Sequence, residues 1–156
     1  MVRSAKIPGR PCSVAASLQL VGDRWSLLAL REILFGNRRF SQIARNTGAP
    51  RDRLAARLKN LLADGIVERR EYQAARFEYH LTDAGKDLYS VLTAFIAWGD
   101  RWAVDQPSLF LEHYGHRLEA VTTCAGCGQP VDPDALHMVS QAPGWSLSGP
   151  DKEANA

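Results

Sequence analysis

The chain has 156 residues, 46% of them hydrophobic and 23% charged, which is the composition of a globular protein and excludes a disordered polyampholyte. No run reaches the roughly 18 apolar residues of a membrane-spanning helix, and the N-terminal MVRSAKIPGRPCSV is too polar for the apolar region of a signal peptide. We therefore expect a cytoplasmic protein made of one domain and an appendage.

The formal net charge of +2 is unevenly distributed. Residues 36–80 contain ten Lys and Arg against five Asp and Glu, so the rest of the chain carries a surplus of three negative charges. A basic segment in an otherwise slightly acidic chain is typical of a nucleic-acid contact. A solvated surface can show the same imbalance, so charge alone leaves both interpretations open.

The first third of the chain predicts three helices. CSVAASLQLVG (12–22) carries apolar residues at helical spacing and ends at a glycine. Asp23 is the expected N-cap of RWSLLALREILFG (24–36), which is apolar around most of its circumference and should be largely buried. RRFSQIARNTG (38–48) predicts a helix of about two turns, again ended by glycine.

A further helix follows directly after the turn Thr-Gly-Ala. Together with the helix before the turn (38–48), it predicts a helix-turn-helix. Pro50 suits its first position, which needs no N–H, and Asp64-Gly65 should end it. Its apolar face consists of Leu54, Leu58, Leu61 and Leu62. Arg53 and Arg57 fall on roughly the opposite side, and Arg51 lies in the first turn. The question is whether this is a solvated face or one that contacts DNA.

IVERREYQAARFEYHL (66–81) alternates with the period of strands around the four-residue connection QAAR, which predicts a β-hairpin. The expected inner face is Val67, Phe77, Tyr79 and Leu81. The arginines at 69, 70 and 76 lie on or beside the turn and give the hairpin a basic tip, although Arg69 has Glu71 and Glu78 as alternative partners.

Thr82 is the expected N-cap of one long helix, DAGKDLYSVLTAFIAWGDRWAVD (83–105). Its broad apolar face contains Leu88, Val91, Leu92, Phe95, Ile96, Trp98 and Trp102. Because this face is wider than a small domain covers, we favour an interface between two subunits over packing within the domain alone.

Residues 106–139 predict a small β-rich appendage around CAGCGQPVDP, and residues 140–156, rich in Pro, Gly, Ser and Ala, are expected to be disordered. Residues 1–11 form an N-terminal arm, so that the main domain spans 12–105.

Several of these motifs occur together in the order of a known family. Cys12 before the first helix, GDRWSLLALREIL, RRFSQI, RLAARLKNLLADGIVERR and EYHLTDAGKDL resemble the HxlR-type bacterial winged-helix regulators, relatives of the MarR-like regulators, over residues 12–102. The resemblance implies a mainly α (α+β) winged helix-turn-helix with a two-stranded wing and a long dimerisation helix. It also implies a homodimer that binds double-stranded operator DNA and performs no catalysis.

In such a protein the second helix of the helix-turn-helix, here the one with Arg51, Arg53 and Arg57, enters the major groove with its N-terminal part. Arginine can bind guanine there with two hydrogen bonds. Arginines at the shorter helix and the hairpin would contact the DNA backbone. The predicted DNA-contacting residues are Arg38, Arg39, Ser41, Arg51, Arg53, Arg57, Arg69, Arg70 and Arg76.

Cys12 has two open interpretations. Some members of the family use the cysteine at this position to sense oxidants or electrophiles, and Arg10 nearby would favour a thiolate. Against this, the winged-helix segment contains no second cysteine, which favours a structural small residue.

The appendage contains His113, His116, Cys124 and Cys127, a set that could hold zinc in a tetrahedral site, with His137 as a further candidate. A hairpin without metal is the alternative. A thioredoxin-like redox enzyme is disfavoured because no βαβ unit surrounds the cysteine pair.

The sequence as a whole predicts a DNA-binding transcription regulator, acting as a homodimer on a palindromic operator, that responds to an oxidant or a small molecule. The alternative is a winged-helix adaptor that binds protein and not DNA. Whether the protein represses or activates stays open.

Overall fold

The structure, a computed structural model, describes residues 9–151. The described residues form two units, residues 12–92 and residues 9–11 with 93–151. Most of the predicted N-terminal arm, residues 1–8, and the end of the predicted tail, residues 152–156, lie outside the described residues. No helix within residues 9–151 has the length and apolarity to cross a membrane.

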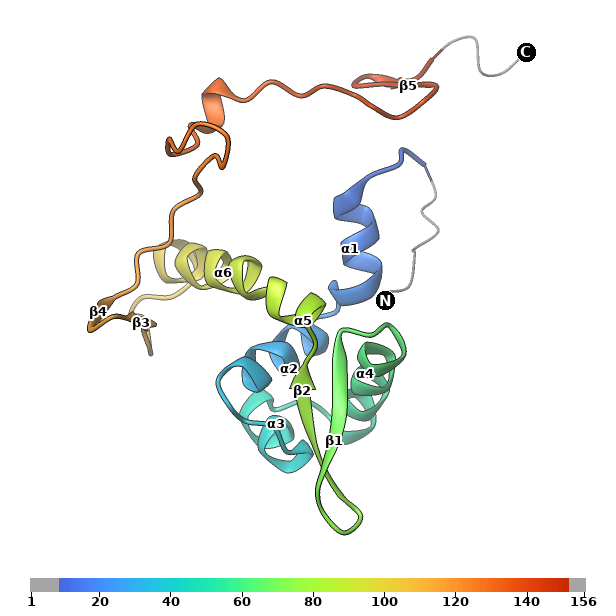
Figure 1. The fold of residues 1–156 in the computed structure, drawn as a ribbon, viewed down its shortest axis with the longest axis vertical. Coiled ribbons are helices and arrows are strands. Elements are labelled where there is room, and N and C mark those ends of the chain that lie inside the picture. The colour runs from blue at the N-terminus through green and yellow to red at the C-terminus, as the bar shows by residue number, and fades with distance from the viewer. Residues whose placement is uncertain (1–8, 152–156) are drawn as a thin grey trace. The chain divides into compact units, whose positions relative to one another are not determined.

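The first unit contains the helices and the hairpin that the sequence predicts (Figure 1). Its elements are α1 (Ser13–Val21), α2 (Arg24–Leu34), α3 (Phe40–Thr47), α4 (Arg51–Ala63), β1 (Val67–Gln73), β2 (Arg76–Leu81) and α5 (Asp83–Asp87). β1 and β2 form a two-stranded antiparallel sheet. This order confirms the predicted winged helix-turn-helix fold.

The ends of the helices follow local sequence signals. The Asp23 side chain accepts the N–H groups of Trp25 and Ser26, as expected of an N-cap. Gly48 ends α3 with a φ of 67°, in the left-handed region that favours glycine. The position predicted for Pro50 was wrong by one residue: it is the N-cap of α4, with a non-helical ψ of 134°. Either position tolerates a missing N–H, so the sequence could not separate them.

The core of this unit lies between the helix-turn-helix and the base of the hairpin. Its largest fully buried side chains are Leu30, Ile43, Leu54, Leu58, Leu61 and Val67. They come from α2, α3, α4 and β1, so the predicted leucine face of α4 is confirmed, with Leu62 half-buried at its edge. Burying these side chains is what holds α4 in place.

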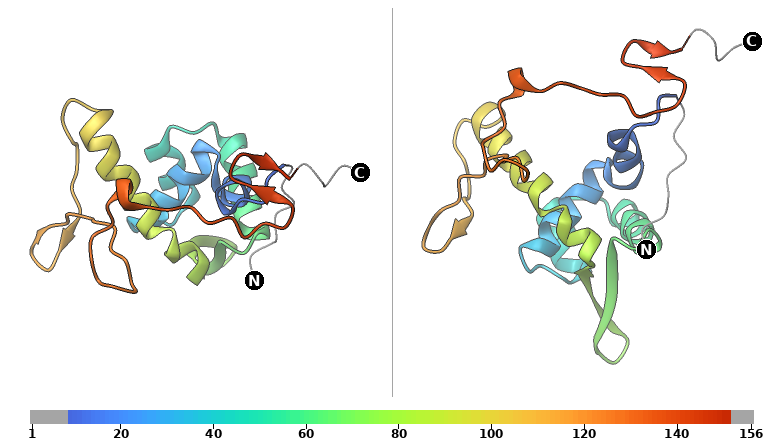
Figure 2. Two further views of the ribbon diagram at one scale, coloured as in Figure 1. Left: turned by 90° about the horizontal axis from the view of Figure 1, so that it is seen from above. Right: turned by 45° about the horizontal axis from the view of Figure 1, so that its top comes forward.

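The hairpin extends beyond α3 and α4 in Figure 1 and in the right panel of Figure 2. The strands continue to Gln73 and Arg76, so the turn is the two residues Ala74-Ala75 instead of the four predicted, and the register shifts just before it. Phe77, predicted on the inner face, is 37% exposed; it is the second residue of β2, next to the turn. At the base, the Tyr79 N–H donates to the Arg38 carbonyl at 2.8 Å and joins β2 to the loop before α3.

The single long helix predicted after the hairpin is two helices, α5 and α6 (Tyr89–Trp102), separated at Leu88. The Thr82 hydroxyl accepts the Gly85 N–H at 3.2 Å. A Cβ on Gly85 would lie 2.3 Å from the Ile66 carbonyl oxygen, so only glycine permits α5 to pack this closely. These tertiary contacts fix α5, whereas the apolar periodicity continues through Leu88 and carries no sign of a break.

The rest of the second unit is made of short elements. They are β3 (Glu112–His113), β4 (His116–Arg117), the 3-10 helix η1 (Pro133–Ala135), β5 (Trp145–Ser146) and β6 (Gly149–Pro150). The short strands expected in residues 106–139 are thus present. Within residues 140–156, for which the sequence predicts disorder, β5 and β6 pair as a hairpin. Gly149, at a φ of 147°, and a 3.0 Å hydrogen bond from the Ser146 hydroxyl to its carbonyl permit this turn.

Candidate nucleic-acid interface

Helix α4 presents two different faces. Leu54, Leu58 and Leu61 are buried, whereas Arg51 and Arg53 in its first turn are exposed. Among the described residues, Arg53 forms no ion pair or hydrogen bond through its side chain. An arginine held on a fixed helix with an unoccupied guanidinium has its five N–H donors available for an external partner.

Arg57 has a different environment from the one that the sequence suggested. Its Nε lies 3.1 Å from Oδ1 of Asp23, and its side chain is 35% exposed. Its guanidinium is held against the N-terminus of α2 by an ion pair that the sequence did not reveal, and its contact with DNA stays a prediction. The helical period places Arg57 opposite the leucines, but it cannot show that Asp23 lies within reach.

Most of the other predicted arginines also have partners within the first unit. Arg39 pairs with Glu78 at 3.2 Å and lies over the Tyr72 ring. Arg69 stacks on Phe77 at 4.0 Å, so the predicted pairing with Glu71 or Glu78 was wrong.

Two further arginines of the predicted set also have partners. Arg70 pairs with Glu68, and Arg51 lies over the Phe40 ring at 5.0 Å. Arg38 is exposed, as are Arg76 and Ser41, and none of the three forms a side-chain ion pair within residues 9–151. The basic surface is thus partly neutralised around the arginines of the wing.

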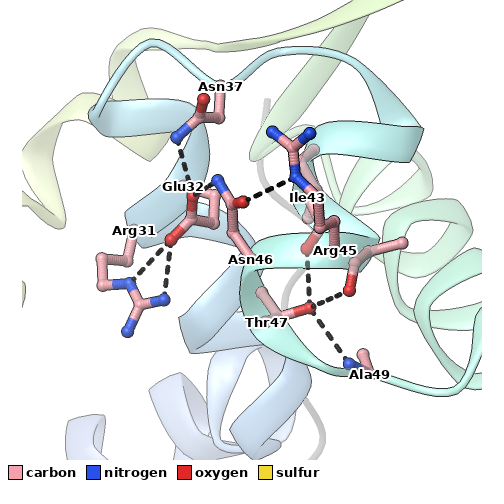
Figure 3. Close-up of polar contacts among 9 residues, drawn as sticks. Arg31, Glu32, Asn37, Ile43, Arg45, Asn46, Thr47 and Ala49 are labelled. Atoms are coloured by element: carbon pink, nitrogen blue, oxygen red, sulfur yellow. Dashed lines mark hydrogen bonds and ion pairs between the residues drawn. The ribbon is translucent and has the colours of Figure 1, made fainter.

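A polar network between α2 and α3, which sequence analysis missed, centres on the buried Glu32 (Figure 3). Glu32 Oε2 accepts from Asn37 Nδ2 and from Asn46 Nδ2, each at 2.8 Å. Glu32 Oε1 accepts from Arg31 at 2.7 Å. The signal that could have revealed it is a glutamate beside Arg31 in the largely apolar LREILFG, because a buried carboxylate requires donors.

Comparison with known proteins settles what kind of protein carries this helix-turn-helix. The sequence model of the HxlR-like helix-turn-helix family matches residues 20–107. The chain belongs to this family. It is therefore a DNA-binding transcription regulator of the helix-turn-helix type, and the family is one of transcription regulators.

Individual relatives agree with this assignment. Rv3095 of Mycobacterium tuberculosis, an uncharacterised HTH-type transcriptional regulator, is 41% identical over 125 residues, 76% of this chain and 79% of its own. PA1607, described as a candidate transcription factor, has a TM-score of 0.74 at 31% identity and covers 83% of this chain and 94% of its own. The redox regulator HypR in its oxidised form has a TM-score of 0.53 at 29% identity, covering 58% of this chain and 96% of its own.

In this HxlR-like regulator the apolar residues predicted as a dimer interface divide into two groups. Leu92 is buried and Leu88 packs against the core, so both serve the fold of the first unit. The exposed group consists of Val91, Phe95, Trp98 and Trp102, at 42%, 57%, 61% and 65% exposure. Large apolar side chains grouped along one helix are typical of a surface that contacts another protein.

The wing of the regulator carries a titratable side chain among its arginines. Burial lowers the pKa of His80 below its ordinary value, and Arg38 and Arg70 lower it further, against a smaller opposite effect of Glu78. His80 is consequently mostly in its neutral form at pH 7. Burial also raises the pKa of the neighbouring Tyr79.

The cysteines lie in two places. Cys12 is the N-cap residue of α1, half-buried, and its side chain makes no capping hydrogen bond. Cys124 and Cys127 are exposed free thiols of the second unit. Hydrogen bonds from the backbone N–H groups of Cys127 and Gly126, and from the Cys127 thiol, lower the pKa of Cys124. No three His, Cys, Asp or Glu side chains of residues 9–151 are grouped as ligands of one metal ion.

Proposed function

We propose that this HxlR-like regulator acts as a homodimer on a palindromic operator and that Arg53 of α4 reads a base in the major groove. The observation that carries the proposal is the contrast between the two faces of α4. Leu54, Leu58 and Leu61 pack in the core, whereas Arg53 is exposed and has no partner among the described residues. Recognition helices contact bases with their N-terminal residues, and Arg53 lies in the first turn. Arginine discriminates guanine through a bidentate contact with O6 and N7.

The second part of the proposal concerns the subunit contact. The exposed Phe95, Trp98 and Trp102 of α6 meet the same side chains of a second copy, because an apolar face of this size is stabilised by burial. Two-fold symmetry then places the two α4 helices on half-sites about one turn of DNA, roughly 34–36 Å, apart. The operator is consequently palindromic.

The remaining cationic residues position the protein on the DNA without reading sequence. Exposed side chains without internal ion pairs, such as Arg38 and Arg76, contact phosphate directly. Arg39, Arg57 and Arg70 must first compete with their own carboxylate partners, so their contribution to binding is smaller.

The experiment that tests base reading compares Arg53→Ala with wild type on operator DNA and on unrelated DNA at one salt concentration. The operator is obtained by footprinting the DNA that flanks the gene. We expect Arg53→Ala to weaken operator binding by about 1–3 kcal/mol and to change non-specific binding much less. Arg70→Ala is the matched control, an arginine of the wing that should affect both DNAs alike. An equal loss on both DNAs for Arg53→Ala would refute its base-reading role.

We also propose that oxidation of Cys12 regulates DNA binding. The support is that Cys12 lies at the N-terminus of α1 with a thiol free of capping bonds, and that HypR, a redox regulator, has a similar fold. Footprinting with and without a hydroperoxide should show release of wild type and continued binding of Cys12→Ser. Equal behaviour of both proteins would contradict the proposal.

A further inference from the structure

The C-terminal part of the chain has defined turns and hairpins but no core. None of residues 94–151 is buried. Large apolar side chains such as Leu136, Met138 and Val139 are 62%, 77% and 82% exposed. A segment of this size that buries so little apolar surface normally needs a disulfide, a metal ion or another chain to hold one conformation.

Two hairpins in this segment each bring together a pair of metal-binding side chains. The first is formed around the cysteines: the Gly128 N–H donates to the Cys124 carbonyl at 2.7 Å, and the Cys124 N–H donates to the Gln129 carbonyl at 2.9 Å. Both thiols face solvent, and N–H groups of the same turn donate to the Cys124 sulfur. Two exposed thiols on one C-x-x-C turn can both bind the same tetrahedral metal ion.

The second hairpin, β3–β4, carries two histidines. His113 and His116 are directly opposite each other in the register, and their ring centroids are 6.0 Å apart. Two imidazoles bound to one tetrahedral Zn²⁺ have ring centres about 5 Å apart, as follows from Zn–N bonds of about 2.0–2.1 Å. The pair is thus close to the required spacing.

A contact of His116 also fixes which of its nitrogens is available. Its Nδ1 lies 3.1 Å from the Arg117 carbonyl oxygen. Because a carbonyl only accepts, Nδ1 carries the proton and Nε2 keeps its lone pair. A histidine that donates one nitrogen to a backbone carbonyl and offers the other to the ion is the usual arrangement in zinc sites.

We propose that His113, His116, Cys124 and Cys127 bind one Zn²⁺ ion, which joins the two hairpins and replaces the missing core of residues 106–139. The inference is independent of DNA binding. Binding releases the two thiol protons, and the segment between the hairpins, residues 118–123, rearranges to bring the pairs together. No residue of this segment is buried and none lies in a regular helix or strand; the movement gives up the hydrogen bonds from the Leu118 N–H to the Leu111 carbonyl and from the Val131 N–H to the Thr122 carbonyl.

The test uses the full chain, purified without chelator. We expect about one zinc per protomer by elemental analysis, and its loss from Cys124→Ser and from His116→Ala. Cobalt substitution then identifies the ligands: a tetrahedral Co²⁺ spectrum with a charge-transfer band of two thiolates is expected. Cys12→Ser and His137→Ala are matched controls, since each removes a side chain of the same type outside the four, and both should retain the metal.

Several outcomes would overturn the proposal. These are protein without zinc that also fails to take up Co²⁺, metal that persists in Cys124→Ser, and a mass lower by two hydrogen atoms, which indicates a Cys124–Cys127 disulfide. A Co²⁺ charge-transfer band with the intensity of four thiolates, together with one metal ion per two protomers, would also overturn it. The ligands would then be Cys124 and Cys127 of two copies, and the histidines would not bind the metal. Far-ultraviolet circular dichroism of each variant checks that the winged helix remains folded.

Discussion

Arg57 of the recognition helix α4 forms an ion pair with Asp23, the residue that caps α2, with Arg57 Nε 3.1 Å from Asp23 Oδ1. The same Asp23 oxygen accepts the N–H groups of Trp25 at 3.0 Å and Ser26 at 3.3 Å. One carboxylate therefore stabilises the start of a buried helix and connects it to α4, the helix proposed to contact DNA.

Substitution of Asp23 separates these two contributions. Asp23→Ala should lower the free energy of unfolding by about 1 kcal/mol or more, because it removes the cap and leaves Arg57 unpaired. Asp23→Asn keeps a capping oxygen and loses only the ion pair, which at this exposure contributes less than about 1 kcal/mol. Urea unfolding of the three proteins measures the difference. Equal destabilisation by Ala and Asn would show that capping contributes nothing.

The Glu32 network predicts a second effect on stability. Glu32→Ala removes the shared acceptor of Asn37 and Asn46, and hydrogen bonds to a charged group contribute about 1.5–3 kcal/mol. Glu32→Gln, of similar size, should recover part of the loss. Arg45→Ala is the control, because Arg45 is exposed and reaches the network only through Asn46 at 3.3 Å. If Glu32→Ala and Arg45→Ala unfold at the same urea concentration, the network does not stabilise the pair of helices.

The proposed subunit contact predicts a change in association. Sedimentation of wild type at micromolar concentration should show a dimer, and Phe95→Ala with Trp98→Ala should shift it toward monomer, since each truncation removes a large apolar contact of about 3–5 kcal/mol if fully buried. Tyr72→Ala, a 41% exposed aromatic of the wing, should leave the dimer unchanged. A monomeric wild type would refute the interface.

His80 predicts a pH dependence of stability. Its pKa in the folded protein lies below the ordinary 6.5, so as the pH falls below about 6.5 the unfolded chain binds a proton before the folded chain does. This contribution is therefore complete above the unfolded pKa and is lost as the pH falls through the folded one. The urea midpoint of wild type should decrease between roughly pH 7.5 and pH 5.5, and His80→Gln should decrease less. Parallel decreases would assign the effect to other groups.

The sequence by itself determined the order of the elements, their caps and the buried face of α4. The Asp23 cap, the glycine after α3 and the spacing of Leu54, Leu58 and Leu61 depend on neighbours within a few residues, which the sequence displays directly. The family motifs were readable for the same reason, because they are local strings in a fixed order.

Only the tertiary structure decided which polar groups already have partners. Arg57 pairs with Asp23, Arg39 with Glu78, and Glu32 with Asn46, all between elements distant in sequence. The separation of α5 from α6 at Leu88 and the close packing of Gly85 on Ile66 are likewise seen only in the folded chain. Periodicity assigns a side chain to a face of a helix, but the distance to its partner depends on how two elements pack. For that reason four arginines that looked equivalent in the sequence, at positions 39, 53, 57 and 70, have different electrostatic environments in the folded protein.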